Sequence, residues 1–265
     1  MNSYTNFAVA SYSFHGLLSI GAIDIFGYLE TVKYRYGLQT ADIWNGYLAS
    51  YDKGFAKILK QGIDERGLTV VNLCCDDAHV WDNDPDIMRK NEETAWKCLE
   101  LAETIGAKTI RIDAGVREDC LSDEQMEYVA KKYREYCQRA ASFGAKLGTE
   151  NHWGATRHIE NVKKIFTAVD EENFGLLLHM GNWATEDPDQ KDQNDVEMIN
   201  RAMHIHIDYP HCEIAERVLP PLKKKGYSGC WTVESHFSTN EYHNVAYQLA
   251  NVRRVVSPMN YDGRS

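Results

Sequence analysis

The chain has 265 residues, of which 43% are hydrophobic and 26% charged, and its formal net charge is -10 at pH 7. An acidic surface repels phosphate backbones, so we expect no nucleic-acid partner. No apolar run approaches the ~20 residues of a membrane span, and the opening MNSYTNFAVA lacks the pattern of a signal peptide. We therefore expect a cytoplasmic protein with no membrane partner. The seven cysteines include no CxxC pair, which predicts reduced thiols.

Short apolar runs alternate with helical patterns along the whole chain. The expected strands are 7–12, 40–44, 68–73, 108–112, 146–150, 174–178, 202–207 and 229–234. The expected helices are 23–36, 51–66, 86–105, 122–143, 156–169, a short helix ending at Arg201, 213–225 and 240–256. Ser122 with Gln125 forms a capping-box pattern, and Pro220–Pro221 should interrupt its helix. We expect a loop over 184–194 and a frayed tail after Pro258.

This alternation, repeated eight times, predicts one domain over residues 1–265 with the fold of a (β/α)8 TIM barrel. About 250 residues is the usual length of such a barrel. A doubly wound open sheet is the alternative, and it would place a glycine-rich phosphate loop after the first strand. Here that turn reads Ser13-Phe14-His15-Gly16, without a GxGxxG pattern.

Polar side chains gather where the expected strands end. In KLGTENHWG, residues 146–154, strand alternation places Glu150 and His152 on one face. Similar groups follow the next three strands, at His179, His206 and Glu234. Barrel active sites lie at the C-terminal ends of the strands. Burying several acids and imidazoles together is costly unless they pair or bind something, so we expect a divalent metal site.

Six motifs give the chain a resemblance to the xylose isomerase-like barrel superfamily of sugar isomerases and epimerases. They are SYSFHG at 11–16, IRIDAG at 110–115, TENHWG at 149–154, GLLLHMGNW at 175–183, HIHID at 204–208 and TVES at 232–235. In that family Glu, Asp, His and Glu, following strands five to eight, hold a divalent metal that is often manganese. The resemblance implies that Glu150, His179, His206 and Glu234 are the ligands here.

His179 departs from the family pattern, which has Asp after the sixth strand. The ligand set loses one negative charge, which leaves the cation more Lewis acidic. Two Glu and two His suit manganese, the first choice, and also zinc, iron or cobalt, better than magnesium. The alternative is that His179 points away and water takes its place.

The resemblance implies proton transfer beside a metal-bound carbonyl, through an enediolate, on a sugar or keto-sugar. Glu150 and Glu234 are the expected catalytic bases, and His152 is either a further acid–base group or a hydrogen-bonding partner. Candidate substrate-binding residues are His15, Trp44, Arg111, Asp113 and His204. Arg111 and Asp113 can equally form an ion pair. Trp44, Trp81, Trp153 and Trp183 follow strands and could wall the pocket or cap the barrel rim.

Several alternatives remain open at this stage. The same enolisation could expel a group, as in a keto-inositol dehydratase or the catalytic subunit of a C-glycoside deglycosidase acting on 3-oxo-glycosides. The expected partners are a small sugar or glycoside substrate, a homo-oligomer and, for the C-glycoside reaction, a small partner subunit. A DNA-repair endonuclease of the same superfamily is disfavoured by the net charge of -10. Loss of metal binding would leave a non-catalytic sugar-binding barrel.

Overall fold

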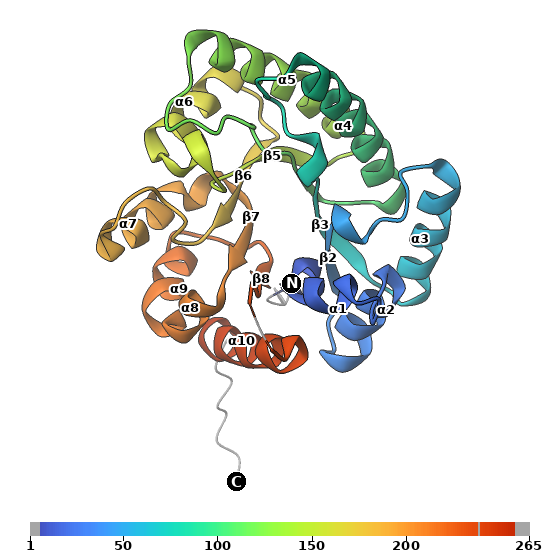
Figure 1. Ribbon diagram of the computed structural model, residues 1–265. Coiled ribbons are helices and arrows are strands. Elements are labelled where there is room, and N and C mark those ends of the chain that lie inside the picture. Colours follow the sequence, from blue (N-terminus) through green and yellow to red (C-terminus); the bar gives the residue numbers. More distant parts are fainter. Residues whose placement is uncertain (1–5, 238, 258–265) are drawn as a thin grey trace.

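The computed structural model describes residues 6–237 and 239–257, and the chain forms a ring of strands surrounded by helices (Figure 1). The tail expected to fray after Pro258 lies outside these residues. All eight expected strands are present. They are β1 (Phe7–Val9), β2 (Thr40–Trp44), β3 (Thr69–Cys74), β4 (Thr109–Arg111), β5 (Lys146–Glu150), β6 (Phe174–His179), β7 (Ala202–Ile207) and β8 (Trp231–Val233).

The strands are parallel throughout and form one sheet in the order β1-β8-β7-β6-β5-β4-β3-β2. The first strand pairs with the last, with Phe7 opposite Trp231. A parallel bridge between Ala10 and Asp42 joins the β1 side to β2 and nearly closes the ring. The predicted single (β/α)8 TIM barrel is therefore confirmed.

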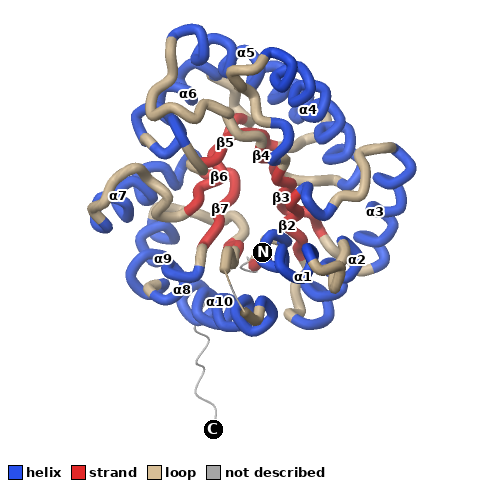
Figure 2. The backbone as a smooth tube through the Cα atoms, viewed as in Figure 1, coloured by secondary structure: helices blue, strands red, loops and turns tan. Residues whose placement is uncertain are grey.

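Helices follow the strands and cover the outside of the barrel (Figure 2). They are α1 (His15–Ser19), α2 (Ile25–Glu30), α3 (Lys53–Glu65), α4 (Pro85–Ile105), α5 (Asp123–Ala141), α6 (Ile159–Val169), α7 (Pro188–Met198), α8 (Tyr209–Glu213), α9 (Ala215–Lys224) and α10 (Glu241–Val256). The predicted capping box opens α5: the Ser122 hydroxyl accepts from the Gln125 amide, and the Gln125 side chain accepts from the Ser122 amide.

Two local predictions were wrong. The expected loop over 184–194 runs into α7, which begins with Asp187 as its N-cap and Pro188 in its first turn. Pro220 and Pro221 lie within α9 without ending it. The carbonyls that lose their usual amide donors belong to Glu216 and Arg217, which are exposed, so water can replace those donors.

A bulge in the pairing of β6 and β7 determines which side chains of these two strands point into the barrel. Leu176 pairs with Ala202, but the next residue, Leu177, pairs with His204. The extra residue, Met203, packs with Leu177 and Cys74 inside the barrel. From there on β6 and β7 are in step, so His204 and His206 face the same side as Leu177 and His179.

The last helix, α10, is hydrogen-bonded to the start of α1, in the segment that follows β1. Glu241, in the first turn of α10, is buried, and its carboxylate accepts from the amides of Gly16 (2.7 Å) and Leu17 (3.0 Å). These amides lie at the start of α1, where a carboxylate is favourable. The loop after β1 is thereby fixed against the end of the barrel that carries β8.

None of the helices in the described residues is long and apolar enough to cross a membrane. The seven cysteines are free, and all except Cys120 are buried.

Candidate metal centre

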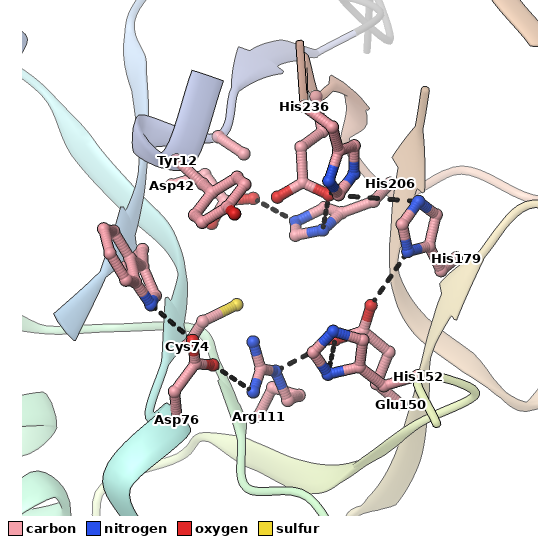
Figure 3. A pocket seen from close by; sticks show the side chains of 13 residues that line it. Tyr12, Asp42, Cys74, Asp76, Arg111, Glu150, His152, His179, His206 and His236 are labelled. Atoms are coloured by element: carbon pink, nitrogen blue, oxygen red, sulfur yellow. Dashed lines mark hydrogen bonds and ion pairs between the residues drawn. The ribbon is translucent and has the colours of Figure 1, made fainter. Parts of the chain in front are cut away.

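A cavity of about 160 Å³ opens at the C-terminal ends of the strands. Every strand, or the residues directly after it, contributes to its wall (Figure 3). The lining side chains are Ala10, Tyr12, Asp42, Trp44, Cys74, Asp76, Arg111, Glu150, His152, His179, His206, Glu234 and His236. The carboxylates and imidazoles predicted from the strand ends thus share one space.

His179 lies between the two glutamates of the cavity. Its Nδ1 is 3.2 Å from Glu150 Oε1, and its Nε2 is 3.9 Å from Glu234 Oε2. All three side chains are more than nine-tenths buried. The side chain of His179 therefore points into the site and not away from it, as Figure 3 also shows.

Glu234 faces two further imidazoles. Its Oε2 lies 3.2 Å from His206 Nδ1 and 3.1 Å from His236 Nε2. The His236 ring stacks on the His179 ring, with 5.4 Å between their centroids. One carboxylate oxygen is thus surrounded by the imidazoles of three successive strand ends.

Asp42 lies behind these histidines, across the barrel from β7. Its Oδ2 accepts from His204 Nε2 at 2.7 Å and from His206 Nε2 at 3.0 Å, while Oδ1 accepts from the Asn72 amide. Burial acts to raise the pKa of Asp42, but the two imidazoles outweigh it and hold the pKa well below its usual range. Asp42 therefore stays ionised, and it directs the Nδ1 atom of His206 towards the cavity.

Arg111 pairs with the acidic side chains on the opposite wall of the cavity. Its guanidinium lies 2.6 Å from Asp76 and 2.9 Å from Asp113, and its Nε is 3.0 Å from Glu150 Oε2. His152 Nδ1 bonds to Asp113 at 2.9 Å. The Arg111–Asp113 ion pair considered from the sequence is present.

The charges of these groups depend on one another. Burial alone would raise the pKa of Glu150, but His152 and Arg111 outweigh it and lower the pKa. Burial alone would lower the pKa of His152, but Glu150 and Asp113 raise it to about 9. Burial alone would also raise the pKa of Glu234, but His206 outweighs it and lowers this pKa. The ionised carboxylate of Glu150 thus faces the imidazole of His152, which holds a proton at neutral pH.

The wall at β1 and β2 is aromatic. Tyr12 and Trp44 line the cavity edge to face, with ring centroids 5.0 Å apart. His15 stacks on Tyr12 at 4.6 Å, and the Trp44 indole donates to Asp76 at 2.6 Å. The cavity therefore has one polar side and one flat, aromatic side.

A divalent cation fits the polar side. Oxygen and imidazole nitrogen atoms are the donors that manganese, zinc, iron and cobalt accept. Within the described residues, His179 Nδ1 and His236 Nε2 are buried, and apart from their ion pairs with Glu150 and Glu234 they have no hydrogen-bonding partner. Three groups of residues bring ligand atoms within 4.8 Å of one another: Asp42, His204 and His206; His179, Glu234 and His236; and Asp113, Glu150 and His152.

The predicted site residues take different places. The four expected ligands line the cavity, and so do His152, Trp44 and Arg111. His204 is buried below the cavity on Asp42. Asp113 lies behind His152 and Arg111, and His15 lies behind Tyr12. Of the tryptophans after strands, only Trp44 lines this cavity.

The family model of the xylose isomerase-like TIM barrel matches residues 34–250 of the chain. The chain belongs to the xylose isomerase-like TIM barrel family. No curated protein sequence matches it significantly.

Solved structures resemble this family member over nearly its whole length. D-allulose 3-epimerase from Methylomonas sp. is 15% identical with a TM-score of 0.76, covering 96% of this chain and 99% of its own. The 3-keto-D-glucoside 4-epimerase YcjR from E. coli is 18% identical with a TM-score of 0.70, covering 87% and 94%. The IolI protein, solved with a zinc atom, is 13% identical with a TM-score of 0.73, covering 96% and 100%. At these identities the likeness shows the shared fold.

This xylose isomerase-like barrel also uses residues that were not among the predicted site residues. Asp76 and His236 follow strands, so the strand-end pattern contained them, whereas Asp42 lies within β2. Tyr12 follows β1 and Cys74 ends β3. What the sequence lacked was the direction of each side chain, which depends on the bulges and on contacts across the barrel.

Proposed function

We propose that the protein is a divalent-metal-dependent enzyme that isomerises or epimerises a sugar or keto-sugar by moving a proton next to a carbonyl. The observation that supports it is the pair of glutamates, Glu150 and Glu234, on either side of His179 in one cavity. Two carboxylates on opposite sides of a substrate could remove a proton from one face and return a proton to the other.

The ion would be held on the polar side, by Glu234, His179 and His206 together with a further side chain of the cavity. When bound, it acts as a Lewis acid that polarises a carbonyl and makes the adjoining C–H bond more acidic. Glu150 is ionised at neutral pH because Arg111 and His152 lower its pKa, so it can accept the proton. Arg111 also holds the Glu150 carboxylate in position.

A lyase is the second candidate, and the aromatic wall of Tyr12 and Trp44 favours it. After the same proton removal, a bond from the neighbouring carbon to its substituent would break, and the electron pair would leave with the substituent. A flat, apolar leaving group would stack against that wall. A keto-inositol dehydratase and a C-glycoside deglycosidase of 3-oxo-glycosides are the predicted forms, the latter with a small partner subunit. A homo-oligomer is also proposed.

The test is exchange of the substrate α-proton with deuterated solvent, followed by NMR. Ketoses, inositol ketones and 3-oxo-glycosides would be compared with and without Mn²⁺. We expect metal-dependent exchange with one class, accompanied by an epimer or by an eliminated product, which separates isomerase from lyase. Glu150→Gln should abolish exchange. Exchange that is absent throughout, or undiminished in Glu150→Gln, would contradict the proposal.

A further inference from the structure

His236 is a cavity residue that the predicted ligand set does not include. It lies two residues after Glu234, and its Nε2 is 3.1 Å from Glu234 Oε2. Apart from this ion pair, the nitrogen is buried and has no hydrogen-bonding partner among the described residues. An imidazole nitrogen in this state, next to a carboxylate, is suited to bind a cation.

The two other histidines beside Glu234 each have one nitrogen next to an outer carboxylate. His206 gives Nε2 to Asp42 at 3.0 Å, which leaves Nδ1 on the side of Glu234 at 3.2 Å. His179 has Nδ1 3.2 Å from Glu150, which leaves Nε2 on the side of Glu234 at 3.9 Å. A histidine that binds a metal commonly donates its other N–H to a carboxylate. In both rings, the nitrogen left free points towards Glu234.

Glu150 is placed as such an outer carboxylate. Its Oε2 lies 3.0 Å from the Arg111 guanidinium, where a dication would be repelled by a like charge. Its ligand atoms group with Asp113 and His152, whereas those of His179 group with Glu234 and His236 within 4.8 Å. Two ligands of one ion with bonds of about 2.1 Å lie at most ~4.2 Å apart, so small rotations would complete the second group.

We propose that His236, and not Glu150, completes the metal site, so that His179, His206, Glu234 and His236 hold the ion. Glu150 then lies outside the ion, next to His179 Nδ1, and would take the substrate proton without being a metal ligand. Three imidazoles and one carboxylate favour zinc, cobalt, iron or manganese over magnesium. This inference rests on the proposed function, since it names the ligands of the same site.

Binding of Co²⁺ to the metal-free full-length protein tests the assignment. Dissociation constants would be measured by competition with a chromophoric chelator for the wild type, His236→Gln, Glu150→Gln and, as a matched control, His152→Gln. We expect His236→Gln to weaken binding more than 100-fold, since loss of a ligand should exceed the 10–100-fold typical of an outer partner. Glu150→Gln keeps an oxygen that can accept from His179, so it and His152→Gln should stay within about 10-fold of the wild type.

Two further measurements separate a lost ligand from a damaged fold. Pulsed EPR of the Mn²⁺ form should show three coordinated imidazoles in the wild type and two in His236→Gln. His236→Asp should recover much of the affinity because it restores a ligand atom. Loss of Co²⁺ in Glu150→Gln with retention in His236→Gln would overturn this assignment but leave the proposed function standing. Failure of the wild type to bind Co²⁺ or Mn²⁺ would overturn both.

Discussion

Asp195 supports the loop after β6, and its replacement by Asn should make the protein less sensitive to rising pH. The residue lies in α7 and is 2% exposed. Its carboxylate accepts from the Trp183 indole at 2.7 Å and from the Gly181 amide at 3.0 Å. Burial raises the pKa of Asp195 to about 7, although the Trp183 hydrogen bond and the charge of His211 oppose this rise and Asp192 adds to it.

The sign of the effect follows from proton binding. Between the ordinary pKa of 3.8 and the folded value of about 7, the folded state holds a proton that the unfolded state has lost. Folding stability must therefore fall as pH rises through this window. At 1.36 kcal/mol per pKa unit, the contribution of Asp195 falls by roughly 2.5 kcal/mol between pH 5 and pH 8.

Asn keeps a side-chain oxygen for Trp183 and Gly181 but carries no titratable group. The assay is urea unfolding of both proteins at several pH values, read by tryptophan fluorescence. Relative to the wild type, Asp195→Asn should gain roughly 2.5 kcal/mol on going from pH 5 to pH 8. Asp189→Asn, an exposed change on the same helix, controls for the lost charge. A wild-type–variant difference that is the same at both pH values would refute the reasoning.

Three further predictions concern the barrel and its site. Gly148→Ala should destabilise the protein by more than the roughly 1–3 kcal/mol of ordinary overpacking, because the new Cβ would lie 1.6 Å from the Gly175 carbonyl oxygen. Gly175→Ala should cost less when both variants are compared in thermal melts, because its new Cβ would lie 2.6 Å from Met203 Cβ, a less severe overlap. Equal costs would contradict this. Asp42→Ala should weaken Co²⁺ binding about 10–100-fold in chelator competition, since it removes every side-chain oxygen that could accept from His206 Nε2. Unchanged affinity would show that Asp42 does not orient that ring. Adding a divalent ion at 100 times its dissociation constant to chelator-treated protein should increase the free energy of unfolding by about 2.7 kcal/mol. A melting temperature that is the same with and without the ion would contradict the presence of a metal site.

The sequence was sufficient for the barrel because its signals are local. Strand–helix alternation and caps such as Ser122 with Gln125 need no knowledge of distant residues. The α7 helix was missed because its polar sequence resembles a loop, although Asp187 followed by Pro188 is a helix-start signal. That signal is local and agrees with the structure.

Part of the cavity lining was predictable from the sequence, but the contacts between its residues were not. The strand-end rule brought Glu150, His179, His206 and Glu234 to one cavity, as expected. It could not show that Asp42, from the other side of the barrel, would bind two histidines. That contact depends on register shifts in β2–β3 and β6–β7, which are set by packing and leave no simple mark in the sequence.

The bond between Glu241 and the amides of Gly16 and Leu17 has a consequence for how the protein is made. Because β1 has β8 as its sheet partner and the loop after it is held by α10, the aromatic wall cannot settle while the chain is still being synthesised. The residues up to α10 must have left the ribosome before Tyr12 acquires its final surroundings. The cavity is therefore incomplete until β8 and α10 have docked, and a chain terminated before β8 would lack Glu234 and His236 from its wall.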